Sequence, residues 1–504
     1  MDKTTHSKKL KKRLLQSEVL RLFCVLSIRS HTATNKELHC LLTIPYLCSM
    51  ISWDQYTREF KYNFRLAWPV MVGYLGQVLV GLADNIMVGK LGPVALATIS
   101  LANSTIFFVM SFGIGFSSAI TPLVSEALGL NDKNRLHKIF YNGLIANTLT
   151  GIVMVAIIYA VIPLLPHAKQ PPEVVALAVP YIRWVGFSVL LVMIFQAMKQ
   201  FSDGLGLTKI SMHAILITNV INIAVSYVLI YGVGFFPRLG VLGAGLGTVF
   251  ARLVIIGIFW ILLYRHPATR EFVSKLPVKV WDSSILKKIF SLGFPSGYQS
   301  VFEMGIFTAS VWLAGMLGTV AQAANQIALQ MASMTFMVFV GLGVAATVRV
   351  GYRYGKKEYV ELRRIAFSVF MQAALIGLFF SLLYIAFRHQ LPWIYLSRQK
   401  DDPQVFEVAR LAAELLIIAG LFQISDSLQV TAQGALRGLQ DVKIPVMITF
   451  VSYWLIGFPV AWFGAKTWGV HGIWIGLFIG LTVAAVLLIW RFHVLTKRLI
   501  KSSE

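Results

Sequence analysis

The sequence has 504 residues, of which 57% are hydrophobic and 13% are charged, and its mean hydropathy is +0.71. These values exclude an ordinary soluble protein and predict a chain embedded in a lipid bilayer. Lysine and arginine outnumber the acids by 45 to 22, but they lie in short clusters between apolar segments. This pattern favours a membrane protein with basic cytoplasmic loops and excludes a nucleic acid as partner.

The cysteines and histidines do not predict a metal site or a disulfide framework. All three cysteines, Cys24, Cys40 and Cys48, precede the apolar part of the chain. The ten histidines are scattered, with no HExxH motif or clustered ligand spacing. No cofactor is therefore expected.

Residues 1–60 form a basic N-terminal extension. A basic cluster at 8–13 is followed by a mixed apolar segment, 14–28, that Glu18 and Arg21 interrupt. The segment is a poor spanning helix, and it lacks the cleavage site of a signal peptide. Because Met50 lies shortly before the first apolar segment, we expect the native start there and interpret 1–49 as an over-extended reading frame.

The remaining chain divides into segments long enough to cross a bilayer, which takes about 20 apolar residues per helix. Six segments carry no charge: 91–125, 139–168, 210–237, 365–387, 444–465 and 467–490. Five more carry one or two charges: 66–89 with Asp84, 174–198 with Arg183, 239–264 with Arg252, 289–348 with Glu303, and 411–436 with Glu414 and Asp426. The segment 289–348 is long enough for two helices joined by a turn near Leu317 and Gly318. The sequence therefore predicts an all-α membrane protein with about twelve transmembrane helices.

The loops alternate in charge. If the chain enters its first span from the cytoplasm, the loops on that side carry most of the lysines and arginines. Both termini are then predicted to be cytoplasmic.

The two halves of the chain repeat one another. An offset of 226 residues, fixed by Pro69 and Pro295, also aligns Gly89 with Gly315, Gly92 with Gly318, Gly115 with Gly341, and Gly129 with Gly355. We expect two six-helix lobes, 61–264 and 288–494, joined by a cytoplasmic loop at 265–287 and followed by a tail at 495–504. An even number of spans per lobe makes the repeats parallel, which predicts two lobes facing a central cavity.

Three carboxylates lie inside the apolar segments: Asp84, Glu303 and Asp426. A charge at the bilayer centre costs about 2.5–3.5 kcal/mol on insertion scales, so such residues usually serve an ion or substrate pathway. A carboxylate can bind a proton or a sodium ion and can pair with a cationic substrate. The alternative is a structural hydrogen bond to a neighbouring helix.

Asp426 belongs to a polar stripe along one helix, formed with Gln423, Gln429 and Gln433. Such a stripe needs water or a partner. Gln299, Asn325, Gln326 and Gln330 are further candidates for lining the cavity, and packing between helices is the alternative for the amides at 325–330.

Other charges have simpler interpretations. Asp203, with Lys199 and Lys209, is interpreted as a loop cluster at a cytoplasmic helix end. Glu414 is expected to pair with Arg410. Arg183 and Arg252 are taken as the only bases within the membrane.

Three motifs resemble the multidrug and toxic compound extrusion transporters, in particular their NorM-type bacterial branch. They are ADNIMVG at 83–89, LGFP at 292–295 followed by Glu303, and FQISDSLQV at 422–430 followed by GALRG at 434–438. The resemblance implies a monomeric antiporter of the bacterial inner membrane that exports organic cations against sodium ions or protons.

The resemblance also assigns residues to sites. Asp84 and Asn222 belong to a site in the N-lobe, where Ser226 stands in place of a second asparagine and leaves the ion preference open. Glu303 and Asp426 form the C-lobe site, a candidate sodium site.

Two other functions are considered. A related flippase for lipid-linked saccharides would share the architecture but would need a cationic cavity for pyrophosphate. A membrane-embedded enzyme would need a nucleophile and base or metal ligands near one membrane face, and no such set is visible.

Overall fold

The computed structural model describes residues 53–167, 170–234, 236–274, 281–396 and 403–503. The expectation about residues 1–49 and the start at Met50 falls outside these ranges. The chain divides into two units, Met1–Thr57 and Arg58–Glu504, and apart from the first residues of α3 all features below belong to the second.

All regular secondary structure of the described residues is helical, which confirms the predicted all-α class. The first half contains α3 (Trp53–Gly89), α4 (Pro93–Ser117), α5 (Ile120–Gly129), α6 (Lys133–Val161), α7 (Pro172–Phe187), α8 (Val189–Gly204), α9 (Thr208–Tyr231) and α10 (Gly240–Arg265). A short helix, α11 (Pro267–Ser274), precedes the second half. The second half contains α12 (Ser283–Met316), α13 (Thr319–Gly355), α14 (Tyr359–Ala386), α15 (Pro403–Gly438), α16 (Lys443–Phe450), a π-helix (Val451–Gly457), α17 (Phe458–Trp468) and α18 (Val470–Lys501).

Ten helical segments of the described chain are long and apolar enough to cross a membrane. Two further helices, α12 and α15, have 34 and 36 residues and are not among these ten. These are the helices that carry Glu303 and Asp426. With them the described residues contain twelve long helical segments, as the sequence predicts, and breaks occur between α4 and α5, between α7 and α8, and from α16 to α17.

The internal repeat is visible in the backbone. The turn between α3 and α4 has Gly92 at φ 115°, ψ 172°, and the turn between α12 and α13 has Gly318 at φ 113°, ψ 172°. Only glycine adopts this region without strain. The predicted break near Leu317 and Gly318 is therefore confirmed, and its equivalent in the first half has the same geometry.

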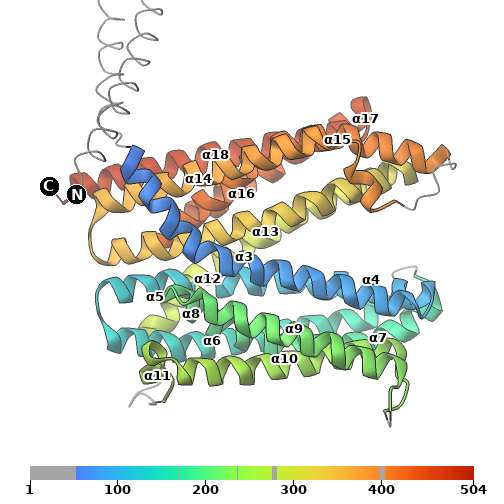
Figure 1. Ribbon diagram of the computed structural model, residues 1–504, viewed down its shortest axis with the longest axis horizontal. Helices are drawn as coiled ribbons and strands as arrows, with labels where there is room; N and C mark the ends of the chain where they lie inside the picture. The colour runs from blue at the N-terminus through green and yellow to red at the C-terminus, as the bar shows by residue number, and fades with distance from the viewer. Residues whose placement is uncertain (1–52, 168–169, 235, 275–280, 397–402, 504) are drawn as a thin grey trace, which may run out of the picture. The chain divides into compact units, whose positions relative to one another are not determined.

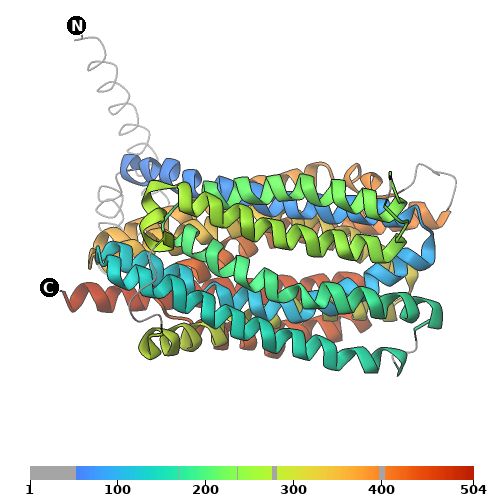
Figure 2. The ribbon, with the colours of Figure 1, turned by 90° about the horizontal axis from the view of Figure 1, so that it is seen from below.

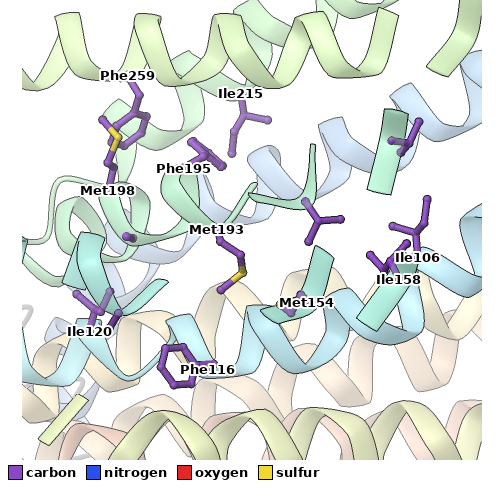
Figure 3. Close-up of a cluster of buried hydrophobic side chains, with 14 of the residues drawn as sticks. Ile106, Phe116, Ile120, Met154, Ile158, Met193, Phe195, Met198, Ile215 and Phe259 are labelled. Carbon is purple, nitrogen blue, oxygen red and sulfur yellow. The ribbon is translucent and has the colours of Figure 1, made fainter. Parts of the chain in front are cut away.

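The apolar core consists of three clusters of buried side chains. Figure 3 shows part of the first, to which α4, α6, α8 and α10 contribute the buried residues Phe116, Met154, Met193 and Phe259, and which also includes residues of α12. The second cluster lies within the second half, and the third joins α13, α14, α15 and α18 to Ala67 and Met71 of α3. Within the first half, α9 and α10 run side by side (Figure 2).

The halves meet through glycines that the repeat relates. A Cβ atom at Gly115 of α4 would lie 2.4 Å from the carbonyl oxygen of Ser296 on α12, and one at Gly341 of α13 would lie 2.5 Å from Met71 Cγ on α3. Gly129 and Gly355, a further repeat pair, face each other where α5 meets α13. Backbones approach this closely only where side chains are absent.

Helix α3 connects the two groups of helices. It runs between α13 to α15 on one side and α9 and α10 on the other (Figure 1). Near its beginning, Glu59 and Asn63 contact Arg349 of α13. Near its end, the hydroxyl of Tyr231 on α9 donates a hydrogen bond of 2.8 Å to the carbonyl oxygen of Met87.

Candidate functional site

Glu303 is held by two amides from the facing helix. The side-chain amide of Gln429 donates a hydrogen bond of 2.9 Å to Glu303 Oε1, and that of Gln433 donates to the same oxygen. Gln429 and Gln433 lie one turn apart on α15, so they present their donors along one face toward α12. A carboxylate held in this way has a fixed position and retains its second oxygen for a further ligand.

Asp426 lies one turn before Gln429 on α15, with 3% of its surface exposed. Among the described residues, no hydrogen bond to its side chain is found. The charge of Glu303 acts on Asp426, and the charges of both acids act on the buried Tyr453. Two carboxylates that repel one another in an apolar interior favour a cation between them.

Tyr453 lies on the π-helix that separates α16 from α17. π-Helical turns are rare and often occur at functional sites, because the extra residue turns side chains out of the regular helical register. Tyr453 was missed as a site residue, and no sequence pattern points to it. Gln433 was placed in the polar stripe of α15, and the structure adds its contact with Glu303.

The remaining candidate amides of the second half have different surroundings. Gln423 Oε1 accepts a hydrogen bond of 2.6 Å from the hydroxyl of Thr335 on α13. The side-chain amide of Gln299 donates a hydrogen bond of 3.0 Å to the hydroxyl of Thr449 on α16. Asn325 is fully buried and accepts 3.0 Å from the indole of Trp474 on α18. These three side chains join helices.

Gln326 and Gln330 lie one turn apart on α13, and both side chains are exposed. Asn325, which the sequence groups with them, is instead buried.

In the first half, Asp84 of α3 has one side-chain oxygen, Oδ1, that is buried without a hydrogen-bond partner. Asn222 Oδ1 and Ser226 Oγ of α9 are likewise buried and unpartnered. Buried polar atoms are normally satisfied, so each of these oxygens has capacity for a water or an ion. The structure forms no hydrogen bond from Asp84 to either residue within the described chain.

Asp84 and Ser226 have different neighbours, which is consistent with the absence of a hydrogen bond between them. The charge of Asp84 acts on Tyr181 of α7, whose hydroxyl donates 3.3 Å to Asn103 of α4. Ser226 Oγ instead lies against α10, where a Cβ atom at Gly247 would come within 2.5 Å of it. Ser226 is therefore placed at the contact between α9 and α10.

Besides Arg183 and Arg252, which the sequence predicts as the only bases within the membrane, further bases lie within long helical segments. Lys199 lies inside α8 and Arg437 in the last turn of α15. Both stand among polar neighbours in the sequence, which makes them look like residues of a helix end outside the membrane.

Lys199 and Asp203 form a buried ion pair on α8 and not a loop cluster, which corrects the sequence interpretation. Lys199 Nζ lies 2.8 Å from Asp203 Oδ2, and Ser211 donates 2.8 Å to Asp203 Oδ1. The two side chains are 5% and 0% exposed. Their i,i+4 spacing lets each neutralise the other, which explains how both are tolerated inside the bundle.

Glu414 pairs with Arg410, as predicted, with 3.3 Å between Arg410 Nε and Glu414 Oε1. Its other oxygen, Oε2, lies 3.1 Å from His471 Nε2 of α18. In the described part of the chain, no group of three or more His, Cys, Asp and Glu side chains is arranged to hold a metal ion. A sodium ion at Glu303 and Asp426 would therefore be held by two carboxylates together with amide or hydroxyl oxygens.

Comparisons with known proteins agree with this architecture. The profile of the MatE family matches residues 69–228 and 295–463, one block in each half. The probable multidrug resistance protein NorM of Rhizobium meliloti (strain 1021) is 35% identical over 449 residues, which cover 88% of this chain and 95% of that protein.

Two solved structures share the fold. One, a transporter of the MOP superfamily from Pyrococcus furiosus, has a TM-score of 0.78 at 21% identity and covers 88% of this chain and 96% of its own. The other, an outward-facing multidrug resistance MATE family transporter, has a TM-score of 0.77 at 21% identity and covers 87% and 96%.

Proposed function

Since this chain belongs to the MatE family of multidrug and toxic compound extrusion transporters, we propose that it is an antiporter exporting organic cations in exchange for sodium ions or protons. The chain is a multi-pass membrane transporter and not an enzyme. Its similarity to the NorM multidrug resistance protein of Rhizobium meliloti supports drugs or toxins as cargo. The exchange requires no cofactor beyond the coupling ion.

The observation that carries the proposal is the pair of acids on α12 and α15. Glu303 is fixed by two amides of α15, and Asp426, one turn before Gln429 on the same helix, has no hydrogen-bond partner in the described chain. Two ionised carboxylates in this arrangement repel one another. A bound sodium ion or proton relieves this repulsion, and so does an organic cation. Ion and cargo therefore compete for the same charge, which is the requirement for exchange.

Alternating access couples this competition to transport. The coupling ion enters from outside, displaces the cargo outward and is released into the cytoplasm. One elementary charge moving across 100 mV supplies about 2.3 kcal/mol, which limits the electrical contribution per ion. Asp84, whose Oδ1 is buried without a partner, supplies a second place in the first half where a cation can bind.

The proposed setting is the bacterial inner membrane, with both termini in the cytoplasm and the transporter acting as a monomer. The excess of lysine and arginine in the cytoplasmic loops supports this orientation.

Drug resistance in an efflux-deficient bacterial host tests the proposal. Expression of the wild type is expected to raise the inhibitory concentration of cationic drugs, and Asp426→Asn is expected to abolish this effect at an unchanged protein level. Glu414→Gln is the matched control, because Glu414 lies on the same helix but is half-exposed and paired with Arg410. Unchanged resistance with Asp426→Asn would refute the assignment.

A lipid-linked saccharide flippase is the alternative from the same superfamily. The Pyrococcus furiosus transporter is described as having a binding pocket of reverse polarity, which suggests a different function for that protein. Here Asp84, Glu303 and Asp426 favour a cationic cargo over a pyrophosphate. Transport of a lipid-linked pyrophosphate in vesicles, without export of organic cations, would favour the flippase.

A further inference from the structure

Arg437 is a half-buried base near the acidic pair, and the exchange described above does not yet use it. Its Nη2 donates 3.2 Å to Gln299 Oε1, while its Nε is buried without a hydrogen-bond partner. A guanidinium is charged under all physiological conditions and has five donors. Arg437 therefore has donor capacity to spare in its present position.

The geometry gives Arg437 two places to bind on α12. Gln299 and Glu303 are four residues apart on that helix, and Gln433 and Arg437 are four residues apart on α15. Residues with this spacing lie one turn, about 5–6 Å, apart on the same face. Gln433 binds Glu303, and Arg437 binds Gln299 one turn away.

Of the two places, Gln299 and Glu303, charge favours Glu303. Glu303 lies one turn from Gln299 on α12, and its negative charge attracts the guanidinium of Arg437. A carboxylate without a counter-charge is costly in this environment, and Gln299 offers only a neutral oxygen. Arg437 therefore stays at Gln299 only while Glu303 is occupied by another cation or is held by the amides of α15 alone.

We propose that Arg437 is a tethered cation that competes with the coupling ion for Glu303. When the ion leaves, the guanidinium moves one turn from Gln299 to Glu303, and when the next ion binds it returns. Arg437 lies at the end of α15 that the charge of the loops predicts to be cytoplasmic. It therefore promotes ion release on that side. The inference rests on the proposed antiport and adds a positioning residue to it.

The test measures ion dependence in proteoliposomes with the purified full chain, using imposed sodium and pH gradients separately. Arg437→Gln removes the competitor, so the half-saturating concentration of the coupling ion should fall about tenfold or more, as for loss of one nearby opposite charge. The maximal rate should fall as well, because release becomes slow. Arg437→Lys keeps the charge and should restore much of the rate.

Gln299→Leu provides the opposite perturbation. It removes the resting partner of Arg437 and should drive the guanidinium onto Glu303, so the half-saturating ion concentration should rise. Simple structural damage would not shift the two variants in opposite directions. Arg491→Gln is the matched control, because Arg491 of α18 pairs with Asp441 and forms no ion pair or hydrogen bond with Glu303 or Gln299 in the described chain, and the substitution should leave the ion dependence unchanged.

A second measurement keeps the test decisive if a variant transports poorly. The indole of Trp454 donates a hydrogen bond of 3.2 Å to the carbonyl oxygen of Phe302, next to Glu303. The chain has 12 tryptophans, so the part of the fluorescence that Trp454→Phe removes should report ion binding in detergent. Ion-driven exchange by the wild type together with unchanged or parallel shifts in Arg437→Gln and Gln299→Leu would overturn the inference alone. Absence of any ion response in the wild type would overturn both this inference and the proposed antiport.

Discussion

Replacing Gly355 by alanine perturbs the contact between the two halves without touching the acids. Gly355 ends α13 and faces α5, where an added Cβ atom would lie 2.3 Å from the carbonyl oxygen of Glu126. That oxygen belongs to the backbone, so no flexible side chain can move aside. The two helices must therefore separate, or α5 must deform.

The size of the effect follows from this distance. Ordinary contact begins at 3.4 Å, so the added methyl group is about 1 Å too close. Overpacking of this kind typically costs about 1–3 kcal/mol. Gly257 on α10 is the matched control, because an added Cβ atom there meets no atom within 4 Å. Alanine in place of glycine inside a helix stabilises by about 0.5–1 kcal/mol, so the two substitutions should have opposite signs.

The assay is reversible unfolding of the purified protein in mixed micelles with increasing sodium dodecyl sulfate, followed by tryptophan fluorescence. We expect a lower free energy of unfolding for Gly355→Ala and an equal or higher one for Gly257→Ala. Gly355→Ala should also reduce export, since the halves no longer close together where α5 meets α13. Gly355→Ala with the stability and export rate of the wild type would refute the reasoning about this contact.

Two further predictions concern stability. Trp474→Phe removes the donor to Asn325 and leaves a buried amide oxygen unpaired, so the free energy of unfolding should fall by about 1–3 kcal/mol; no loss in the same micelle titration would contradict the role of this bond. Asp282, outside the membrane, caps α12, and hydrogen bonds from Ser284 and then Lys138 hold the pKa of its carboxyl below the ordinary value of about 4. Its ionised form therefore stabilises the fold above that pH and loses this effect as the pH falls through the lowered pKa, so Asp282→Asn should destabilise at pH 7 and progressively less below pH 4. A difference between the two proteins that stays constant from pH 7 to pH 3 would contradict this assignment.

The sequence predicts the helices and their repeat well, because both depend on local properties. Apolar segment length predicts the twelve helical segments, and the offset of 226 residues anticipates the matching turns at Gly92 and Gly318. The same offset relates Gly129 to Gly355, which the fold brings face to face.

The partners of the acids are less predictable, because spacing along one helix identifies a shared face and not what the opposite helix presents. The amide stripe on α15 was expected to be polar, but its contact with Glu303 depends on the packing of α12 against α15. Arg437 was missed because it lies near a helix end in sequence and becomes half-buried only in the bundle. Lys199 and Asp203 look like a loop in sequence, because the ion pair that permits their burial forms only when α8 packs against its neighbours.

Export driven by an ion gradient is the central claim, and one measurement tests it most directly. Purified protein in proteoliposomes would be given an inward gradient of sodium or of protons, separately, while movement of a fluorescent organic cation in the opposite direction is followed. We predict that one of the two gradients drives uphill movement by the wild type, and that Asp426→Asn, at equal reconstitution, does not respond. Movement that ignores both gradients, or that continues undiminished in Asp426→Asn, would contradict the account.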